Sequence, residues 1–243
     1  MEIKARDVVL APVSAEGTVE KIVRRLGEAI GSGLIAPGER LPPEAELAAQ
    51  LSVATMTLRQ ALAILRDAGF VETRRGRGGG TFVRDDPWAA LTPTMDEPPA
   101  RQLRELTDWR RAVSGEAAAL AAVRAPAAEI AAIDDLARTA ETLVPDAGAF
   151  RRADAHFHVA VAEAARSRRL IEAEAQIQAD LAHVLRLAPG SAEVRQISQA
   201  GHGPVVAAIA RHDPDGARAA MLAHVEATHD WVVGLRLGVS PRP

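Results

Sequence analysis

Between Pro37 and Val83, hydrophobic positions first recur with a helical period and then with a strand period. Residues 44–51 are predicted as a short helix, because proline turns precede them and Ser52 and Val53 break the pattern. A second helix runs to Ala68, and its leucines share one face: Leu58, Leu62 and Leu65. Two short helices joined by a tight turn predict a helix-turn-helix.

After Gly69 the pattern indicates two strands, 70–73 and 81–83, joined by a loop of arginine and glycine. Such a loop forms a wing, since glycine lets the backbone approach a phosphate and arginine supplies positive charge. The inward leucines leave the opposite helix face for base edges in a major groove. The DNA-contacting residues that we expect are Thr55, Met56 and Arg59 on the helix, and Arg74, Arg75, Gly76 and Arg77 on the wing.

Apolar positions between Thr18 and Ile30 predict a further helix, which completes a winged helix-turn-helix domain over residues 1–84. Its first 15 residues resemble a loose arm. Residues 85–100 hold four prolines and therefore form a linker, on which Trp88 could dock against a neighbouring domain.

From Arg101 to the end, helical periodicity never gives way to a strand pattern. Proline and glycine breaks divide residues 101–243 into six helices, at about 101–124, 127–143, 148–166, 168–188, 192–211 and 214–236. The fold class is therefore mainly α, with an antiparallel six-helix bundle after the winged domain.

Composition supports this division and adds a charge asymmetry. The 243 residues are 48% apolar, with much alanine and few aromatics, which favours closely packed helices. Residues 1–84 hold 12 Lys and Arg against 10 Asp and Glu, and the remainder holds 17 against 22. Within residues 52–84 the balance is six arginines to two acids, so the basic charge is local to the predicted DNA-binding face.

The chain lacks cysteine and long apolar runs, and both observations narrow the class of protein. The chain has no cysteine, which excludes disulfides and thiolate zinc sites. No apolar run approaches the length that crosses a bilayer, so we expect a cytoplasmic protein.

All seven histidines lie between residues 156 and 229. Asp154 and His158 share a helix face, and His202 and His224 lie beside apolar stripes, so the four could meet inside the bundle. One carboxylate with three imidazoles suits Zn, Ni, Cu or Fe, and keeps Mn possible. The alternative is ordinary hydrogen-bonded core histidines. The other histidines are expected to be polar or surface residues, with His183 a candidate for a pocket: His156, His183, His212 and His229.

The first part of the chain resembles the winged-helix domain of GntR-family transcription regulators over residues 18–83. The matching motifs are Leu34-Ile35-x-Pro-Gly-x-Arg-Leu-Pro-x-Glu, Leu47-Ala48, Thr57-Leu58-Arg59-Gln60-Ala61-Leu62, Gly69-Phe70-Val71 and Gly80-Thr81-Phe82-Val83. The resemblance implies DNA contacts by Thr57 and Arg59, and by Arg75 and Gly76 at the wing tip. Ala45 and Thr55 stand where many members have arginine, which puts the operator sequence in doubt.

The second part resembles the ligand-binding domain of the FadR subfamily, called FCD, over about residues 104–233. The matching motifs are Asp154-x-x-Phe157-His158, His202 before Val206-x-x-Ile209, and Asp213 leading through Ala217 to Met221-x-x-His224-Val225. With six predicted helices it is similar to the VanR-like branch. The resemblance implies a divalent metal, most simply Zn, Ni or Mn, on Asp154, His158, His202 and His224, and a small carboxylate effector that also pairs with Arg110.

This chain departs from that pattern at a few positions. Ser114 replaces the usual acid four residues after Arg110, and Ser167 replaces a frequent Asn. Glycines flank His202, and Pro204 is expected to make the helix begin near His202.

The predicted function is a metabolite-responsive transcription regulator, in particular a repressor that binds a pseudo-palindromic DNA operator as a homodimer. A metalloenzyme fused to a DNA-binding domain is one alternative, although no His-Glu-x-x-His pair occurs. An architectural DNA-binding dimer without an effector is another, and metal analysis separates it from the first prediction.

Overall fold

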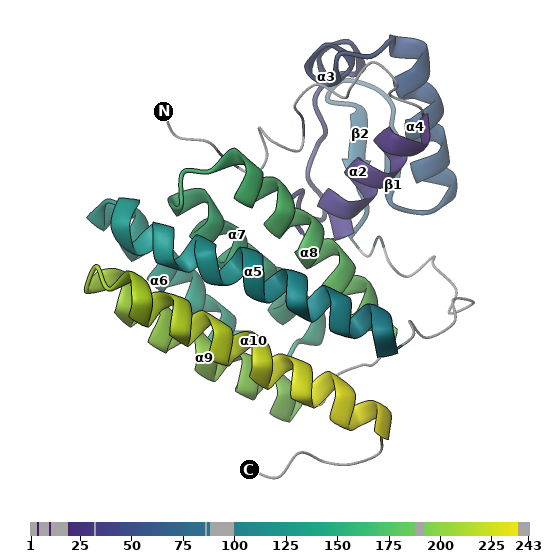
Figure 1. Ribbon diagram of the computed structural model, residues 1–243. Coiled ribbons are helices and arrows are strands. Elements are labelled where there is room, and N and C mark those ends of the chain that lie inside the picture. Colours follow the sequence, from purple (N-terminus) through teal and green to yellow (C-terminus); the bar gives the residue numbers. More distant parts are fainter. Residues whose placement is uncertain are drawn as a thin grey trace. The chain divides into compact units, whose positions relative to one another are not determined.

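The computed structural model describes residues 4, 10, 19–31, 33–85, 87, 100–187 and 192–237 (Figure 1). The predicted N-terminal arm and linker lie almost entirely outside these residues, as does Trp88. Contacts along the chain define two compact units that divide between Met95 and Asp96. Each unit is described by itself.

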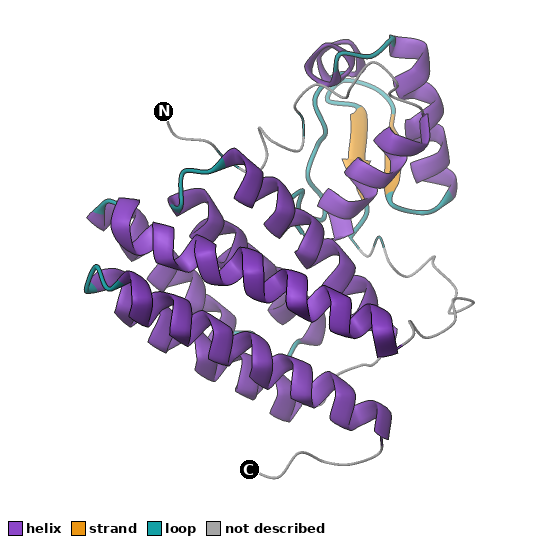
Figure 2. Cartoon of the chain, in the orientation of Figure 1, coloured by secondary structure: helices purple, strands orange, loops and turns teal. Residues whose placement is uncertain are grey.

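The first unit is a three-helix domain with a two-stranded wing (Figure 2). Its elements are α2 (Val19–Gly31), α3 (Glu44–Leu51), α4 (Thr55–Asp67), β1 (Val71–Arg74) and β2 (Gly80–Val83). Leu58, Leu62 and Leu65 are buried, together with Ile22 and Leu26 of α2, and form its core. The predicted helix-turn-helix is confirmed, and the tight turn between α3 and α4 places Ser52 in the left-handed region at φ 55°.

The wing is an antiparallel pair in which Val71 faces Val83 and Arg74 faces Gly80. The extended residues before α3 join its edge, because the Leu41 amide donates to the Thr81 carbonyl at 2.9 Å. Both strands differ from the predicted ones by a single residue at one or both ends. Gly79 is required in the loop, since a Cβ there would lie 2.4 Å from the Arg74 carbonyl oxygen.

The second unit is a bundle of six helices among the described residues, as predicted. They are α5 (Ala100–Arg124), α6 (Ala127–Thr142), α7 (Ala147–Ala164), α8 (Arg168–Leu187), α9 (Ala192–Ala210) and α10 (Pro214–Leu237). α10 packs against both α5 and α9, and α7 packs against α5, α6 and α8. Its core combines many small alanines with a few large side chains, among them Phe157, Ile209 and Met221. This composition lets the helix axes approach closely.

Two aspartates begin helices of the bundle. The Asp146 carboxylate accepts the Gly148 and Ala149 amides at 2.9 and 3.0 Å, before α7. Asp213 accepts the Gly216 amide at 2.8 Å, before α10. These bonds satisfy amides that have no partner within their own helix.

The expectation that Pro204 would start a helix near His202 is wrong. α9 begins at Ala192 and continues through Pro204, with buried side chains on both sides of it, including Ser198 and Val205. A proline inside a helix removes one backbone hydrogen bond. Packing of α9 against α6 and α10 offsets that loss. The local sequence around Pro204 carries no information about this packing, which is why the expectation failed.

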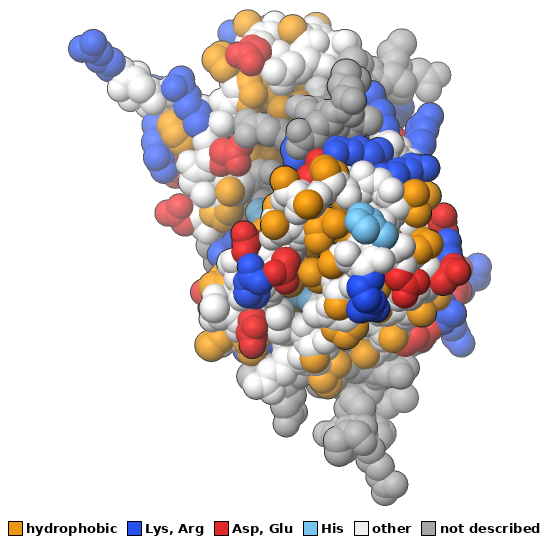
Figure 3. All heavy atoms as spheres, turned by 90° about the vertical axis from the view of Figure 1, so that its left-hand side faces the viewer, with side chains coloured by type: hydrophobic (Ala, Val, Ile, Leu, Met, Phe, Trp, Pro, Cys, Tyr) orange, Lys and Arg blue, Asp and Glu red, His pale blue; other side chains and the backbone are white. Residues whose placement is uncertain are grey.

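The surface view in Figure 3 shows acidic and basic side chains interspersed among hydrophobic ones on one face of the molecule. Ion pairs also join helices of the bundle, such as Arg218 with Glu116 at 2.8 Å and Arg166 with Glu129 at 2.5 Å. None of the helices in the described part of the chain has the length and apolar character of a membrane span.

Candidate nucleic-acid face and candidate metal centre

The outer face of α4 carries the side chains predicted to meet DNA. Thr55, Met56 and Arg59 are exposed, Met56 at 62% of its surface, whereas Thr57 is half-buried. The opposite face packs into the core through Leu58, Ala61 and the leucines beyond. An amphipathic helix so placed offers its first turns to a groove while its leucines hold it on the domain.

Arg59 does not extend freely from this face. Its Nε donates to Glu44 Oε2 at 2.6 Å, and both side chains are largely exposed. Sequence reasoning missed this partner, although Glu44 begins the neighbouring helix and belongs to the Pro-x-Glu motif. The contact orients the guanidinium beside α4 and leaves its terminal nitrogens available for a base edge.

The wing arginines differ in their surroundings. The Arg74 guanidinium lies 4.4 Å from the Phe82 ring centroid and donates to Glu72 at 2.7 Å. Arg75 and Arg77 are exposed on either side of Gly76, whose φ is 97°. Arg74 therefore contributes to the folded wing, whereas Arg75 and Arg77 present their charges on its exposed surface.

The bundle brings the four predicted metal ligands together. Asp154 and His158 come from α7, His202 from α9 and His224 from α10, and all four side chains are buried. One possible ligand atom from each lies within 4.8 Å of the others. Four residues separated by up to 70 positions in the chain thus share one interior site.

Their spacing and chemistry fit a divalent cation. His158 Nε2 lies 3.0 Å from His224 Nε2, and His202 Nε2 lies 3.0 Å from Asp154 Oδ1. Ligand atoms bound at about 2.0–2.2 Å to one ion lie about 3 to 4.4 Å apart. His158 Nδ1 and His224 Nδ1 are buried with no partner within hydrogen-bond distance among the described residues, whereas the Nε2 atoms of both rings contact Arg110 and each other.

Neighbouring polar groups hold other members of the cluster. Ser198 donates its hydroxyl hydrogen to Asp154 Oδ1 at 2.9 Å, and Gln199 Oε1 lies 3.2 Å from His202 Nδ1. The Phe157 ring stacks on His202 with centroids 4.1 Å apart. Together these contacts restrain the rotation of the carboxylate and of one imidazole.

The electrostatics keep the ligands in their metal-binding forms. Burial lowers the pKa of His158 well below its usual value and lowers the pKa of His224 to about 3, and the Arg110 charge acts in the same direction. Burial is the largest single influence on Asp154 and works to raise its pKa, but the hydrogen bond with His202 and the influence of the three neighbouring histidines together hold that pKa well below its usual range. At neutral pH His158 and His224 are therefore neutral imidazoles and Asp154 is an ionised carboxylate.

Arg110 of α5 lies against this cluster and is only 3% exposed. Its Nη2 lies 3.1 Å from His158 Nε2 and 3.2 Å from His224 Nε2, while its Nε has no partner. No carboxylate of the described residues lies within ion-pair distance of it. Burial lowers the pKa of this guanidinium, and the charges of Asp154 and Glu174 oppose the shift.

A second carboxyl group, Glu174 of α8, was missed from the sequence. It is fully buried, accepts the Ser114 hydroxyl at 2.8 Å and the Gln178 amide at 2.7 Å, and lies 3.9 Å from His158 Nδ1. Burial raises the pKa of Glu174, although both hydrogen bonds act against that shift. Ser114, noted as a departure from the family pattern, thus contacts an acid supplied by another helix.

Three of the other histidines, His156, His212 and His229, lie apart from these four. His156 is half-buried on α7, and His212 Nδ1 lies 2.8 Å from the Ala122 carbonyl oxygen. His229 differs from the expectation of an ordinary polar residue, because it lines a groove beside Arg110. The side chain of His183 lies outside the described residues.

A winged helix-turn-helix unit and a helical unit with a buried His and Asp cluster define a class of two-domain transcription regulators. The chain matches the family of bacterial regulatory proteins called gntR over residues 18–83 and the FCD domain over residues 105–227. It belongs to the GntR family and has the FadR-type arrangement of a GntR domain followed by an FCD domain.

Known proteins agree with this assignment. The chain is 38% identical to the HTH-type regulator RmpR of Mycobacterium gastri over 215 residues, which are 85% of this chain and 77% of that protein. It is 30% identical to a regulatory protein named for the L-lactate dehydrogenase operon of Escherichia coli, over 86% of this chain and 84% of the relative. Escherichia coli McbR/YncC has a similar fold, with a TM-score of 0.54 at 20% identity over 90% of this chain and 97% of that structure.

Proposed function

We propose that this GntR/FCD regulator is a repressor controlled by a small carboxylate, which binds at a metal-dependent site in the bundle. The observation that carries the proposal is the buried cluster of Asp154, His158, His202 and His224, with ligand atoms within 4.8 Å of one another. The donor set suits Zn, Ni or Mn. A divalent ion held by these residues would offer its open coordination positions to an effector carboxylate.

Arg110 is the proposed second contact of the effector. Its buried guanidinium lies against His158 and His224 and lacks an ion-pair partner among the described residues. A buried cation without an anion is costly, and a planar guanidinium pairs with a carboxylate through two parallel hydrogen bonds. An entering carboxylate would therefore supply the missing negative charge at this position.

The DNA-binding part of the proposal concerns α4 and the wing. Thr55, Met56, Thr57 and Arg59 would meet base edges in the major groove, and Arg74, Arg75, Gly76 and Arg77 would lie along the phosphate backbone, with Arg74 acting mainly through the wing's own structure. A homodimer would place two such faces on the half-sites of a pseudo-palindromic operator.

Control of DNA binding follows from a difference in effector affinity between two arrangements of the dimer. If the effector binds better to the arrangement whose two α4 helices do not match the half-site spacing, it lowers operator occupancy. The linker over residues 85–100 is the proposed connection between the two domains. DNA release by the effector distinguishes a repressor of this kind from an architectural DNA-binding dimer.

The metal site is tested by elemental analysis of the purified full chain. We expect the double variant His158→Ala with His224→Ala to lose its bound divalent metal, because two of four ligands are gone. His156→Ala, on the same helix as His158 but outside the cluster, is the matched control and should keep its metal. An unchanged metal-to-protein ratio in the double variant would reject the site.

A further inference from the structure

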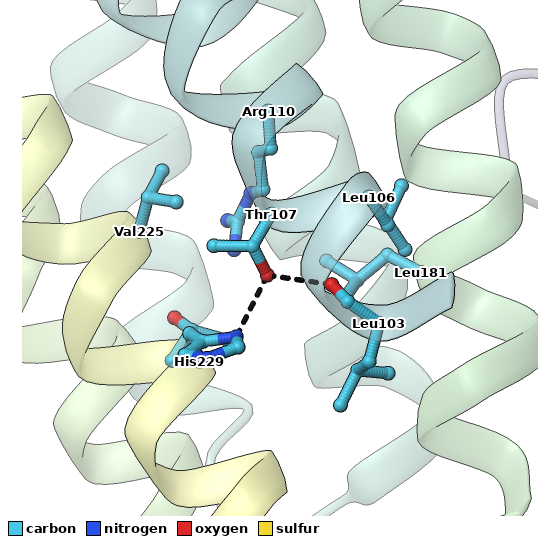
Figure 4. Close-up of a pocket in the computed structure, with 8 residues that line it drawn as sticks. Leu103, Leu106, Thr107, Arg110, Leu181, Val225 and His229 are labelled. Atoms are coloured by element: carbon cyan, nitrogen blue, oxygen red, sulfur yellow. Dashed lines mark hydrogen bonds between the residues drawn. The ribbon is translucent and has the colours of Figure 1, made fainter. Parts of the chain in front are cut away.

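A groove opens beside Arg110, between α5, α8 and α10 (Figure 4). The space between its lining residues amounts to about 310 Å³ when the adjoining open solvent is counted. Figure 4 shows the Arg110 side chain directed into the same space as Thr107, with Val225 on one side and the leucines on the other. Because Arg110 also contacts His158 and His224, the groove and the metal cluster share this residue.

The walls of the groove are apolar. They consist of Leu103, Leu106, Leu181 and Val225, and Arg110 is the only cationic side chain of Lys or Arg type among the residues that line it. A carboxylate lying between these walls would lose its hydration without gaining a counter-ion. The wall chemistry therefore suits a short hydrocarbon chain and opposes a second negative charge.

The polar atoms of the groove lead to the same conclusion. The Thr107 hydroxyl donates to the Leu103 carbonyl at 2.9 Å, and the Thr228 hydroxyl donates to the His224 carbonyl at 3.0 Å. Each hydroxyl donates its one hydrogen to a carbonyl of its own helix, so that only its lone pairs are available to a ligand. These acceptors cannot donate to a carboxylate, which is also only an acceptor.

His229 completes this set. Its Nδ1 lies 2.8 Å from Thr107 Oγ1, and since the Thr107 hydrogen goes to Leu103, Nδ1 carries the hydrogen of this contact. The hydroxyl oxygens of Thr107 and Thr228 can therefore accept a hydrogen from a ligand, but they donate none to a second carboxylate.

We propose that the effector is a monocarboxylate whose tail is a short, mainly apolar chain, and that this groove excludes dicarboxylates. The carboxylate binds at Arg110 and the metal cluster, and the tail lies between the leucines and Val225. The inference rests on the proposed function, since it takes Arg110 and the cluster as the position of the head group.

Calorimetric titration of the metal-loaded full chain with pentanoate and with glutarate tests the inference. The two acids have five carbons each and differ by a second carboxylate at the far end. We expect pentanoate to bind about tenfold or more tightly than glutarate, because the distal carboxylate would be desolvated without a cation. Equal affinities, or tighter binding of glutarate, would overturn the inference.

A variant that adds the missing cation should change this preference. Leu106 lines the groove and is only half-buried, so Leu106→Arg can place its guanidinium there while part of the side chain stays in water. The ratio of the two affinities should move toward glutarate by about tenfold. Val123→Arg adds the same charge to the same helix at a position that is 64% exposed and outside the groove, and should leave the ratio unchanged.

Acetate, which has the head group and almost no tail, separates failure of the inference from failure of the proposed function. If the chain holds metal and binds acetate, but pentanoate binds no tighter than acetate, only the tail assignment is wrong. If the chain holds no metal and binds neither acid, the proposed function fails and the inference fails with it.

Discussion

Two arginines of the winged domain are oriented by neighbouring side chains. Arg59 is fixed by Glu44 from the preceding helix, at 2.6 Å, and Arg74 is fixed by Phe82 and Glu72. An oriented guanidinium loses less conformational entropy when it meets a guanine edge than a freely rotating one. The arginines of the winged domain therefore differ in how far their side chains are oriented, although each contributes one charge.

Arg59→Ala should weaken specific DNA binding by about 1 to 3 kcal/mol if the residue reads a base edge. The measurement is a gel-shift titration with a DNA fragment that the unmodified protein selects from a random pool. Arg66→Ala removes the same charge from the last turn of α4, where Arg66 lies 3.2 Å from Thr73, and is the matched control. Equal losses in both variants would show that Arg59 contributes charge alone.

Glu174 lies beside the His and Asp cluster, with its Oε1 atom 3.9 Å from His158 Nδ1. Glu174→Gln should weaken metal binding about tenfold, because the carboxylate 3.9 Å from Nδ1 favours the ring orientation that presents Nε2 to the ion. Competition with a chelator of known affinity measures the change. Glu172→Gln on the same helix, whose partners Arg168 and Arg169 are on the surface, should have no effect on metal affinity.

Helix α9 contains two glycines and a proline in its interior and lies close to α10. It carries His202 and Ser198 at the cluster and packs against α10, which carries His224. Gly201 allows this approach, since a Cβ there would lie 2.4 Å from His224 Nδ1 and 2.9 Å from its Cβ. At Gly203, two residues later, a Cβ would meet no atom within 4 Å apart from its chain neighbours.

The two glycines form a matched pair for an experiment. Gly201→Ala should displace His224, lower the metal content and lower the melting temperature, because the added methyl meets an imidazole inside the packed bundle. Gly203→Ala should keep the metal, because its methyl group does not meet His224, and should leave the melting temperature close to that of the unmodified protein, since the proline that follows at Pro204 offsets the helix preference of alanine. Thermal unfolding combined with metal analysis checks both, and similar behaviour of the two variants would refute the packing argument.

At the scale of the whole molecule, the proposal is a coupling between a site in the bundle and a DNA face in another unit. Such a coupling requires that the effector differ in affinity between two states of the protein, and typical values are about 1 to 3 kcal/mol. Arg110 belongs to the bundle site and Arg59 to the DNA face. A variant at the first should therefore change the response to effector without changing DNA affinity itself.

Arg110→Ala should leave DNA binding intact in the absence of effector and reduce release of DNA by pentanoate about tenfold or more. Fluorescence anisotropy of a labelled DNA fragment, with increasing pentanoate, measures both quantities. Arg111→Ala is the control, since Arg111 is exposed on the same helix and pairs with Glu226. A variant that releases DNA at the same pentanoate concentration as the unmodified protein would remove Arg110 from the effector site.

Much of this architecture follows from the sequence alone. The period of the leucines placed α4 and its buried face, and proline and glycine breaks placed all six bundle helices within two residues of their observed ends. Local rules suffice for these features, because helix periodicity and caps depend on residues a few positions apart. The separate expectation that Pro204 would make a helix begin near His202 was wrong, because it too used only neighbouring residues. Packing with other helices keeps Pro204 inside α9.

The sequence by itself determined the order of the helices and strands and the exposed arginines of the wing. It also indicated which aspartate and which histidines were candidates for one metal site. Only the tertiary structure decided that Asp154, His158, His202 and His224 meet, that Glu174 contacts Ser114 near His158, and that Glu44 holds Arg59. It also decided that Arg110 borders a groove with apolar walls. The physical reason is that these contacts join different helices, and their distances depend on how whole helix faces pack.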